Sequence, residues 1–325
     1  MSRNEIFAPR AVKGRRTWTA AAVVLIVVFF LIGQLATIFG VLKPMGYHKA
    51  DLDTQWEPFA IFLAGGGITL LLILAWTSLF ERRSPAGLGF KARIAGPYMQ
   101  GLLVGGLALG AVVGVIFAAG GYAAAGSGSW VSPTPALLAP LLVLFGGYMI
   151  QGATEEVMLR GWLMSLIASR HGLVAAVLIN SGFFALLHAS NIDPSGELAL
   201  GLFNLFLFAV ALSLYAIREG SLWGVCAAHT GWNVLLGMGF GLEVSGQTVA
   251  VTPLVANLAP APDAPWWLTG GAFGPEASVV ATIVLAAGCA YLIAKGALTT
   301  TSRPQATRSQ PSTDPTQKSV SHALE

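Results

Sequence analysis

The stretch Thr19–Leu42 reads TAAAVVLIVVFFLIGQLATIFGVL and contains no charged side chain. A helix needs about 20 predominantly apolar residues to cross the hydrocarbon core of a bilayer, so this stretch is long enough to span a membrane. It is too long for the core of a cleaved signal peptide, and we interpret it as a retained first helix. The whole chain fits this class, because 10% of its residues are charged and 55% are hydrophobic, against about a quarter charged in soluble domains.

Apolar runs of similar length recur along the chain, and the alternating pattern of a membrane β-barrel is missing. The sequence therefore predicts an all-α, polytopic membrane helical bundle with about eight transmembrane helices. The fourth run is long for one span, so we expect it to tilt or to break, with Gly146-Gly147 as the candidate position. The predicted spans are residues 18–42, 58–80, 97–124, 136–168, 172–189, 198–217, 222–240 and 277–298.

The loops between these runs differ in charge, and cytoplasmic loops of membrane proteins carry an excess of Lys and Arg. On this criterion both termini are predicted to be cytoplasmic. Residues 1–16 form a basic N-terminus, residues 17–298 form one transmembrane domain, and residues 299–325 have the composition of a disordered tail. The net charge of +3 is small and gives no indication of nucleic acid binding. The basic residues on which the orientation depends include Arg15, Arg16, Arg82, Arg83, Arg170, Arg218 and Lys295.

Three short polar stretches interrupt the apolar runs. Ionisable groups inside membrane spans are costly and usually face a protein interior or a wet cavity. Counting a rise of about 1.5 Å per residue from the nearest cytoplasmic marker places all three stretches at a similar depth in the bilayer. Chance polar residues would seldom share one depth, so the sequence predicts a single site. The stretches are Glu155-Glu156-Val-Met-Leu-Arg160, Phe184-Ala-Leu-Leu-His188 and His229-Thr-Gly-Trp-Asn233.

Helical spacing divides the first stretch into two roles. Glu156 and Arg160 are four residues apart on one helix face, so we expect a structural ion pair between them. Glu155 points about 100° away and is left available for chemistry. Each polar group also has a purely structural reading. Glu155 could bond a neighbouring helix, His188 could be a packed histidine beside Phe184, and the His229/Asn233 pair could link helices.

The combination of groups is typical of a hydrolytic site. A carboxylate can take a proton from water, a histidine beside it can orient that water, and an imidazole with a carboxamide can stabilise an oxyanion. This is the chemistry of a peptide hydrolase without a covalent nucleophile. A divalent metal such as zinc, bound by Glu155, His188 and His229, is the alternative way to activate water. The zinc-protease motif His-Glu-x-x-His and the nucleophile elbow Gly-x-Ser-x-Gly are both missing.

The ordered set Glu-Glu-x-x-x-Arg, Phe-x-x-x-His and His-x-x-x-Asn resembles the CPBP family of intramembrane proteases over residues 136–240. That family comprises CAAX prenyl endopeptidases of the Rce1 type and bacteriocin-processing or self-immunity relatives, also called Abi proteins. The resemblance implies that Glu155 is the carboxylate that activates water and that His188 is its partner. It implies that His229 and Asn233 form the oxyanion site, while Glu156, Arg160 and Phe184 support the geometry.

The resemblance implies an intramembrane endopeptidase that acts on a membrane-associated peptide or protein, which could be lipidated. We favour the version without a metal cofactor, because Glu156 is expected to be committed to Arg160. The Ala- and Gly-rich composition indicates a multi-pass protein of a bacterial plasma membrane. Two other functions stay open on the sequence alone. One is a non-catalytic membrane scaffold or immunity protein, and the other is a proton-coupled transporter in which the acidic and histidine side chains relay protons.

Overall fold

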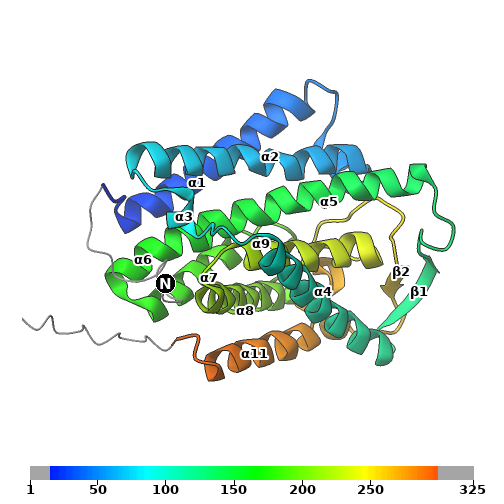
Figure 1. The fold of residues 1–325 in the computed structure, drawn as a ribbon. Coiled ribbons are helices and arrows are strands. Elements are labelled where there is room, and N and C mark those ends of the chain that lie inside the picture. Colours follow the sequence, from blue (N-terminus) through cyan, green and yellow to red (C-terminus); the bar gives the residue numbers. More distant parts are fainter. Residues whose placement is uncertain (1–14, 299–325) are drawn as a thin grey trace, which may run out of the picture.

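The computed structural model describes residues 15–298, and this part of the chain is mostly helical (Figure 1). The predicted tail, residues 299–325, and most of the predicted basic N-terminus lie outside the described residues. In chain order the elements are α1 (Thr19–Thr37), α2 (Trp56–Ala75), α3 (Pro85–Leu88), α4 (Ala95–Ala118), β1 (Tyr122–Ser127), α5 (Pro135–Glu156), α6 (Ser165–His171), α7 (Leu173–Leu186), α8 (Gly196–Glu219), α9 (Trp223–Asn233), β2 (Ala256–Pro260), α10 (Trp266–Thr269) and α11 (Val279–Ala294). Short 3-10 turns occupy Lys49–Asp53, Gly271–Phe273 and Pro275–Ala277. Four helices are prolonged by π-helical turns, at Ile38–Leu42, Trp76–Phe80, Val157–Met164 and Val234–Gly239.

Each of the eight predicted spans corresponds to a helix, and five helical runs are long and apolar enough to cross a membrane. The apolar helices α7 and α11 are shorter than that length. The protein is therefore a multi-pass helical bundle, while the count of eight crossings and the cytoplasmic placement of both termini stay predictions. The five long runs are Thr19–Leu42, Trp56–Phe80, Ala95–Ala118, Pro135–His171 and Gly196–Glu219.

The third span ends earlier than the sequence predicts. A helix was expected through residue 124, because alanine is a strong helix former. Instead α4 ends at Ala118, and Gly120 adopts a left-handed conformation with φ of +76°. Residues Tyr122–Ser127 then form β1, which pairs antiparallel with β2. The pairing partner is distant in the sequence, so local helix propensity gave no indication of this small sheet.

The fourth span is continuous where a break was expected. Helix α5 begins at Pro135, with the Thr134 side chain accepting a hydrogen bond from the Leu137 amide, and passes through Gly146-Gly147 without interruption. A Cβ atom on Gly147 would lie 3.1 Å from Leu63 Cβ, so this glycine allows α2 to pack closely on α5. The irregularity lies one residue beyond the Glu155-Glu156 pair, where the helix becomes π-helical. Such π-helical turns are frequent at functional sites.

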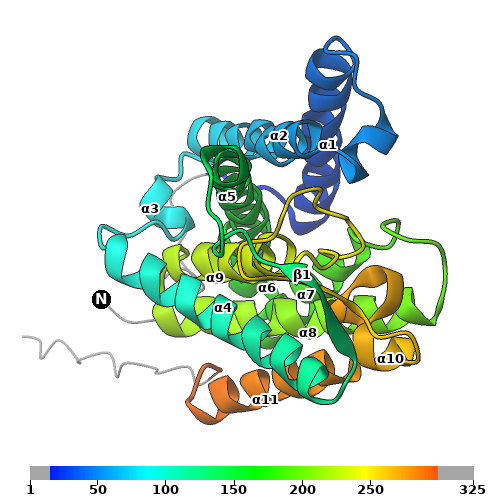
Figure 2. The same cartoon turned by 90° about the vertical axis from the view of Figure 1, so that its right-hand side faces the viewer.

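Helix α5 lies in the middle of the bundle and carries the first polar stretch. In Figures 1 and 2, α1 and α2 cover one side of α5, while α9, α4, α7, α8 and α11 lie on the other. Helix α9 contacts both α5 and α8, and α7 packs along α8. This arrangement brings the three helices with the polar stretches, α5, α7 and α9, around one interior region.

Helix α9 is held in place by close packing against α4. Gly101 and Gly105 are four residues apart on α4, and both face the α9 backbone. A Cβ atom on Gly105 would lie 1.9 Å from the Ala228 carbonyl oxygen, next to His229 in the chain. Such small-xxx-small pairs let membrane helices approach closely.

We expect Gly105→Ala to push α4 and α9 apart and to lower the midpoint of thermal unfolding in detergent. The expected cost is about 1–3 kcal/mol, which is typical of overpacking. Gly106→Ala is the matched control, because nothing lies within 4 Å of its Cβ position. The control should unfold at the native temperature or slightly above it, since alanine favours helix over glycine. Equal midpoints for the two variants would contradict the close α4–α9 contact.

Candidate active site

A buried ion pair anchors the site on α5 and the π-helical turn that follows. The Arg160 Nη1 atom donates to the Glu156 Oε1 atom at 2.9 Å, and both side chains are completely buried. This confirms the ion pair that the spacing predicted. Arg160 also donates to the Ala209 carbonyl oxygen at 3.1 Å, and its guanidinium lies 4.9 Å from the centre of the Phe184 ring. One side chain thus connects α5 with α7 and α8.

The same carboxylate orients a histidine from α9. His229 Nδ1 lies 2.9 Å from Glu156 Oε1, and an ionised carboxylate only accepts, so Nδ1 is the donor. The other ring nitrogen, Nε2, lies 3.9 Å from Glu155 Oε2. Glu156 therefore has a second function that the sequence did not reveal: it fixes the ring of His229 so that Nε2 faces Glu155.

One carboxylate oxygen of Glu155 accepts a hydrogen bond from a side chain, and the other does not. Gln151 Nε2 donates to Glu155 Oε1 at 2.6 Å, whereas Oε2 is buried and has no hydrogen-bond partner within the described residues. A buried carboxylate oxygen without a partner is costly, and such exceptions in a folded protein ask for an explanation. The distance of 3.9 Å to His229 Nε2 is too long for a direct hydrogen bond, and it suits a bridging water or substrate atom.

Asn233 lies one turn after His229 on α9. Its Nδ2 atom donates to the Gln151 Oε1 atom at 3.1 Å, and the side chain is 5% exposed. Gln151 therefore contacts both Glu155 and Asn233, although sequence reasoning missed it. The sequence did contain an indication of this residue: Gln151 is a polar side chain in an apolar helix. It precedes Glu155 by four residues, which places both side chains on the same helix face.

His188 follows the last residues of α7 and lies on the same cavity as Glu155. Its Nδ1 atom lies 2.9 Å from the Phe184 carbonyl oxygen, which makes Nδ1 the donor and Nε2 the acceptor in the neutral ring. The expected packing of Phe184 on His188 is present, with ring centres 4.9 Å apart. The histidine nearest to Glu155 is His229, however, and not the sequence-predicted partner His188.

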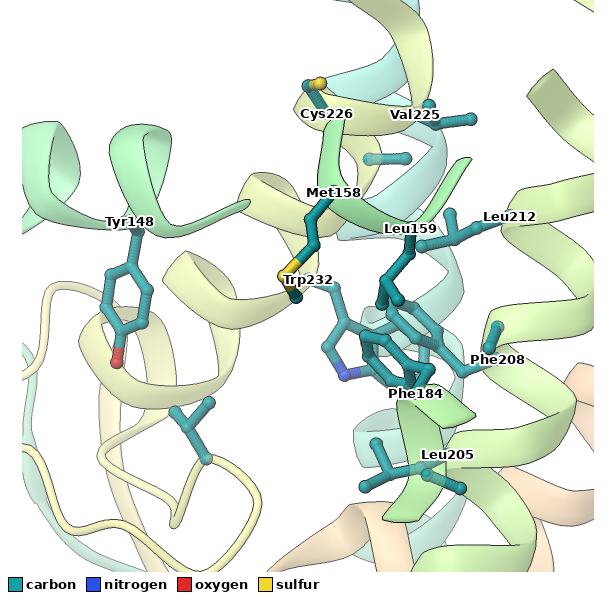
Figure 3. Packing of buried hydrophobic residues seen from close by; sticks show 14 of the residues in the cluster. Tyr148, Met158, Leu159, Phe184, Leu205, Phe208, Leu212, Val225, Cys226 and Trp232 are labelled. Carbon is teal, nitrogen blue, oxygen red and sulfur yellow. The ribbon is translucent and has the colours of Figure 1, made fainter. Parts of the chain in front are cut away.

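Aromatic side chains enclose the polar groups. Figure 3 shows Phe184, Phe208 and Trp232 close together beneath Leu159. The ring centres of Phe208 and Trp232 are 5.0 Å apart, and the Phe208 ring meets His229 edge-on at 5.5 Å. This surrounding keeps bulk water away from the ion pair and lowers the local dielectric, which strengthens the electrostatic interactions inside.

All four predicted catalytic residues open onto one cavity of about 220 Å³. The sequence thus correctly predicted that α5, α7 and α9 bring their polar groups together. The cavity also has a long apolar wall from α1, α2, α7 and α8, and a further polar wall from residues beyond α9 that was not predicted. The polar lining residues are Gln34, Tyr148, Gln151, Glu155, His188, Asn191, His229, Asn233, Ser245, Gln247 and Glu276, and the apolar ones are Phe30, Phe59, Phe62, Leu63, Phe184, Leu187, Leu205, Phe208 and Val244.

The unpredicted wall contains a buried acid, Glu276, which lies just before α11. Its carboxylate accepts hydrogen bonds from Trp232 Nε1 at 2.9 Å and from the Ser245 hydroxyl at 2.7 Å. Burial raises the pKa of the Glu276 carboxyl, and these hydrogen bonds oppose the rise. Through these contacts the segment after α9 forms a wall of the cavity.

The alternative metal site does not assemble among residues 15–298. That part of the chain has no group of three or more His, Cys, Asp or Glu side chains placed to hold a metal ion. His188 donates from Nδ1 to a carbonyl oxygen and His229 donates from Nδ1 to Glu156, so the Nε2 atom of each ring stays free in the neutral histidine.

The fold and the cavity define a polytopic membrane protein with a buried acid, histidine and carboxamide site. Residues 137–235 match the family model described as type II CAAX prenyl endopeptidase Rce1-like. The chain therefore contains an Rce1-like domain, which confirms the resemblance to the CPBP family of membrane proteases. The matched segment contains all four predicted catalytic residues. Comparisons with curated proteins and with solved structures give no significant match.

Proposed function

We propose that this protein is an intramembrane endopeptidase that hydrolyses a peptide bond of a membrane-associated peptide or protein. The observation that carries the proposal is the convergence of Glu155, His188, His229 and Asn233, from three helices, on one cavity inside an Rce1-like domain. Apolar walls beside the polar groups suit a substrate with an apolar or lipidated part. A bacterial plasma membrane stays our proposal for its location.

The proposed reaction needs no covalent intermediate. Glu155 takes a proton from a water molecule, and the water oxygen forms a bond to the carbonyl carbon of the substrate. The carbonyl oxygen becomes an oxyanion, which accepts a hydrogen bond from the second N–H of Asn233 Nδ2. The C–N bond then breaks, and the proton held by Glu155 passes to the leaving amine. The products are a new carboxyl end and a new amino end.

The two histidines differ in what they offer to this reaction. Because His188 donates from Nδ1, its Nε2 can accept a hydrogen bond from the attacking water and orient it. Because His229 also donates from Nδ1, its Nε2 can donate to the oxyanion only when the ring carries both protons. Glu156 thus contributes by holding the ring in the orientation that an oxyanion site requires.

The proposed mechanism uses no metal ion. Glu156 Oε1 is engaged by both Arg160 and His229, so this carboxylate has the structural role of holding these two side chains. Transporters often have helices that are broken near the middle of the membrane. Helix α5 is unbroken at Gly146-Gly147, so this position gives no support to the transporter alternative. In the scaffold alternative the protein has the same fold but catalyses no reaction. The following experiment distinguishes a scaffold from a protease.

The test is a comparison of peptide termini in membranes from cells that carry the native chain or the Glu155→Gln chain at equal abundance. Termini present only with the native chain would support proteolysis, and their sequence would identify the substrate. They would also tell lipidated protein tails from secreted peptides. Identical termini in the two samples would overturn the proposal and favour the scaffold.

A further inference from the structure

We propose that Gln151 is a positioning residue that orients both the general base, Glu155, and the oxyanion donor, Asn233. The inference rests on the proposed function and assigns a role to a side chain outside the family motif. Gln151 lies on α5 one turn before Glu155, and its amide lies between Glu155 and Asn233.

The two ends of the Gln151 amide have different and non-exchangeable partners. The Nε2 atom donates to Glu155 Oε1 at 2.6 Å, and the Oε1 atom accepts from Asn233 Nδ2 at 3.1 Å. An ionised carboxylate can only accept, so the nitrogen of Gln151 must face Glu155. The oxygen must then face Asn233.

The first hydrogen bond selects the reactive oxygen of Glu155. It engages Oε1 and leaves Oε2, which is buried, without a partner, and 3.9 Å from His229 Nε2. The proton-accepting oxygen is thereby held on the side where His229 stands. Without this bond the carboxylate could rotate about its last torsion, which is broad and roughly two-fold.

The second hydrogen bond fixes the carboxamide of Asn233. With Nδ2 turned to Gln151, one N–H is engaged and the second stays available to an oxyanion. If the amide flipped, its oxygen would face the Gln151 Oε1 atom, and two acceptors would be in contact. The amide of Gln151 therefore couples the orientation of Glu155 on α5 with that of Asn233 on α9.

The test compares Gln151→Met and Gln151→Glu with the native full chain, each reconstituted in vesicles. The substrate is a synthetic peptide that spans the cleavage site identified from the peptide termini. Gln151→Met keeps the length and loses both hydrogen bonds. We expect its kcat per folded molecule to fall roughly 10- to 100-fold, the effect of losing a hydrogen bond to a charged group, with KM unchanged. Gln151→Glu keeps an acceptor for Asn233 but places a second carboxylate against Glu155, so its kcat should fall at least as far.

Gln100→Met is the matched control, because Gln100 is an exposed glutamine on α4 that does not line the cavity. Its kcat should stay close to the native value. The double variant Gln151→Met/Asn233→Ala should lose less than the product of the two single losses, because residues that act as a unit are not additive. A merely structural role would instead lower the amount of folded protein and leave the kcat of the folded fraction at the native value.

Two results would overturn the inference. One is a native kcat in Gln151→Met, and the other is a pair of losses at Gln151 and Asn233 that multiply. Glu155→Gln in the same assay separates this failure from a failure of the proposed function. If Glu155→Gln is inactive while Gln151→Met is native, only the positioning role is wrong. If Glu155→Gln cleaves the peptide at the native rate, the proposed function is wrong, and the positioning role falls with it.

Discussion

Glu155→Gln is expected to abolish proteolysis while the protein stays folded. The substitution keeps the shape of the side chain and removes the group that takes the proton from water. General-base catalysis contributes about 10²–10⁴-fold, so kcat should fall by a factor in that range. The measurement is kcat on the peptide identified from native membranes.

Stability provides the second half of this prediction. Glu155 Oε2 is buried without a partner, so removing the charge should leave the unfolding midpoint unchanged or raise it. Glu57→Gln, at the start of α2, is the matched control for loss of one acidic group outside the cavity, and it should cleave at the native rate. Cleavage by Glu155→Gln at the rate of this control would refute the assignment of the base.

Arg160→Met is expected to give the largest loss of stability. It leaves Glu156 buried, charged and without its main partner, and breaking one side of a buried ion pair costs about 3–5 kcal/mol. Because the stability of a folded protein is about 5–15 kcal/mol, much of the variant should be unfolded at growth temperature. The measurement is the midpoint of thermal unfolding in detergent, with the yield of folded protein.

Two further variants make the prediction about Arg160 specific. Arg93→Met removes an exposed arginine from the loop before α4 and should change stability by about 0.5 kcal/mol or less. The double variant Glu156→Gln/Arg160→Met removes both charges and should be more stable than Arg160→Met alone. If the double variant unfolds at a lower temperature than the single one, the cost does not come from an unpaired carboxylate.

The sequence predicted the features that depend on local periodicity. The apolar runs gave the positions of the long helices, and a spacing of four residues gave the Glu156–Arg160 pair. The shared depth of three polar stretches correctly indicated that they meet at one cavity. These inferences need only the rise and the turn of a helix, which the sequence determines directly.

Features that depend on packing between distant segments could not be predicted from the sequence. The bond from His229 to Glu156 joins residues 73 positions apart, and its geometry follows from how α9 sits on α5. Gln151 was one polar residue among many until its two partners were known. The strand β1 has an alanine-rich sequence that favours helix locally, and only its pairing with β2 decides otherwise.

The polar wall formed by Ser245 and Glu276 has an evolutionary consequence. Both residues lie after the last position of the matched domain, residue 235, yet they face the same cavity as the reactive groups. Under the proposed function, part of the wall that a substrate meets is therefore encoded outside the segment that carries the reactive groups. Proteins that share the reactive segment can then differ in the following segment, and so in the shape of the cavity. Sharing the motif therefore does not imply sharing a substrate.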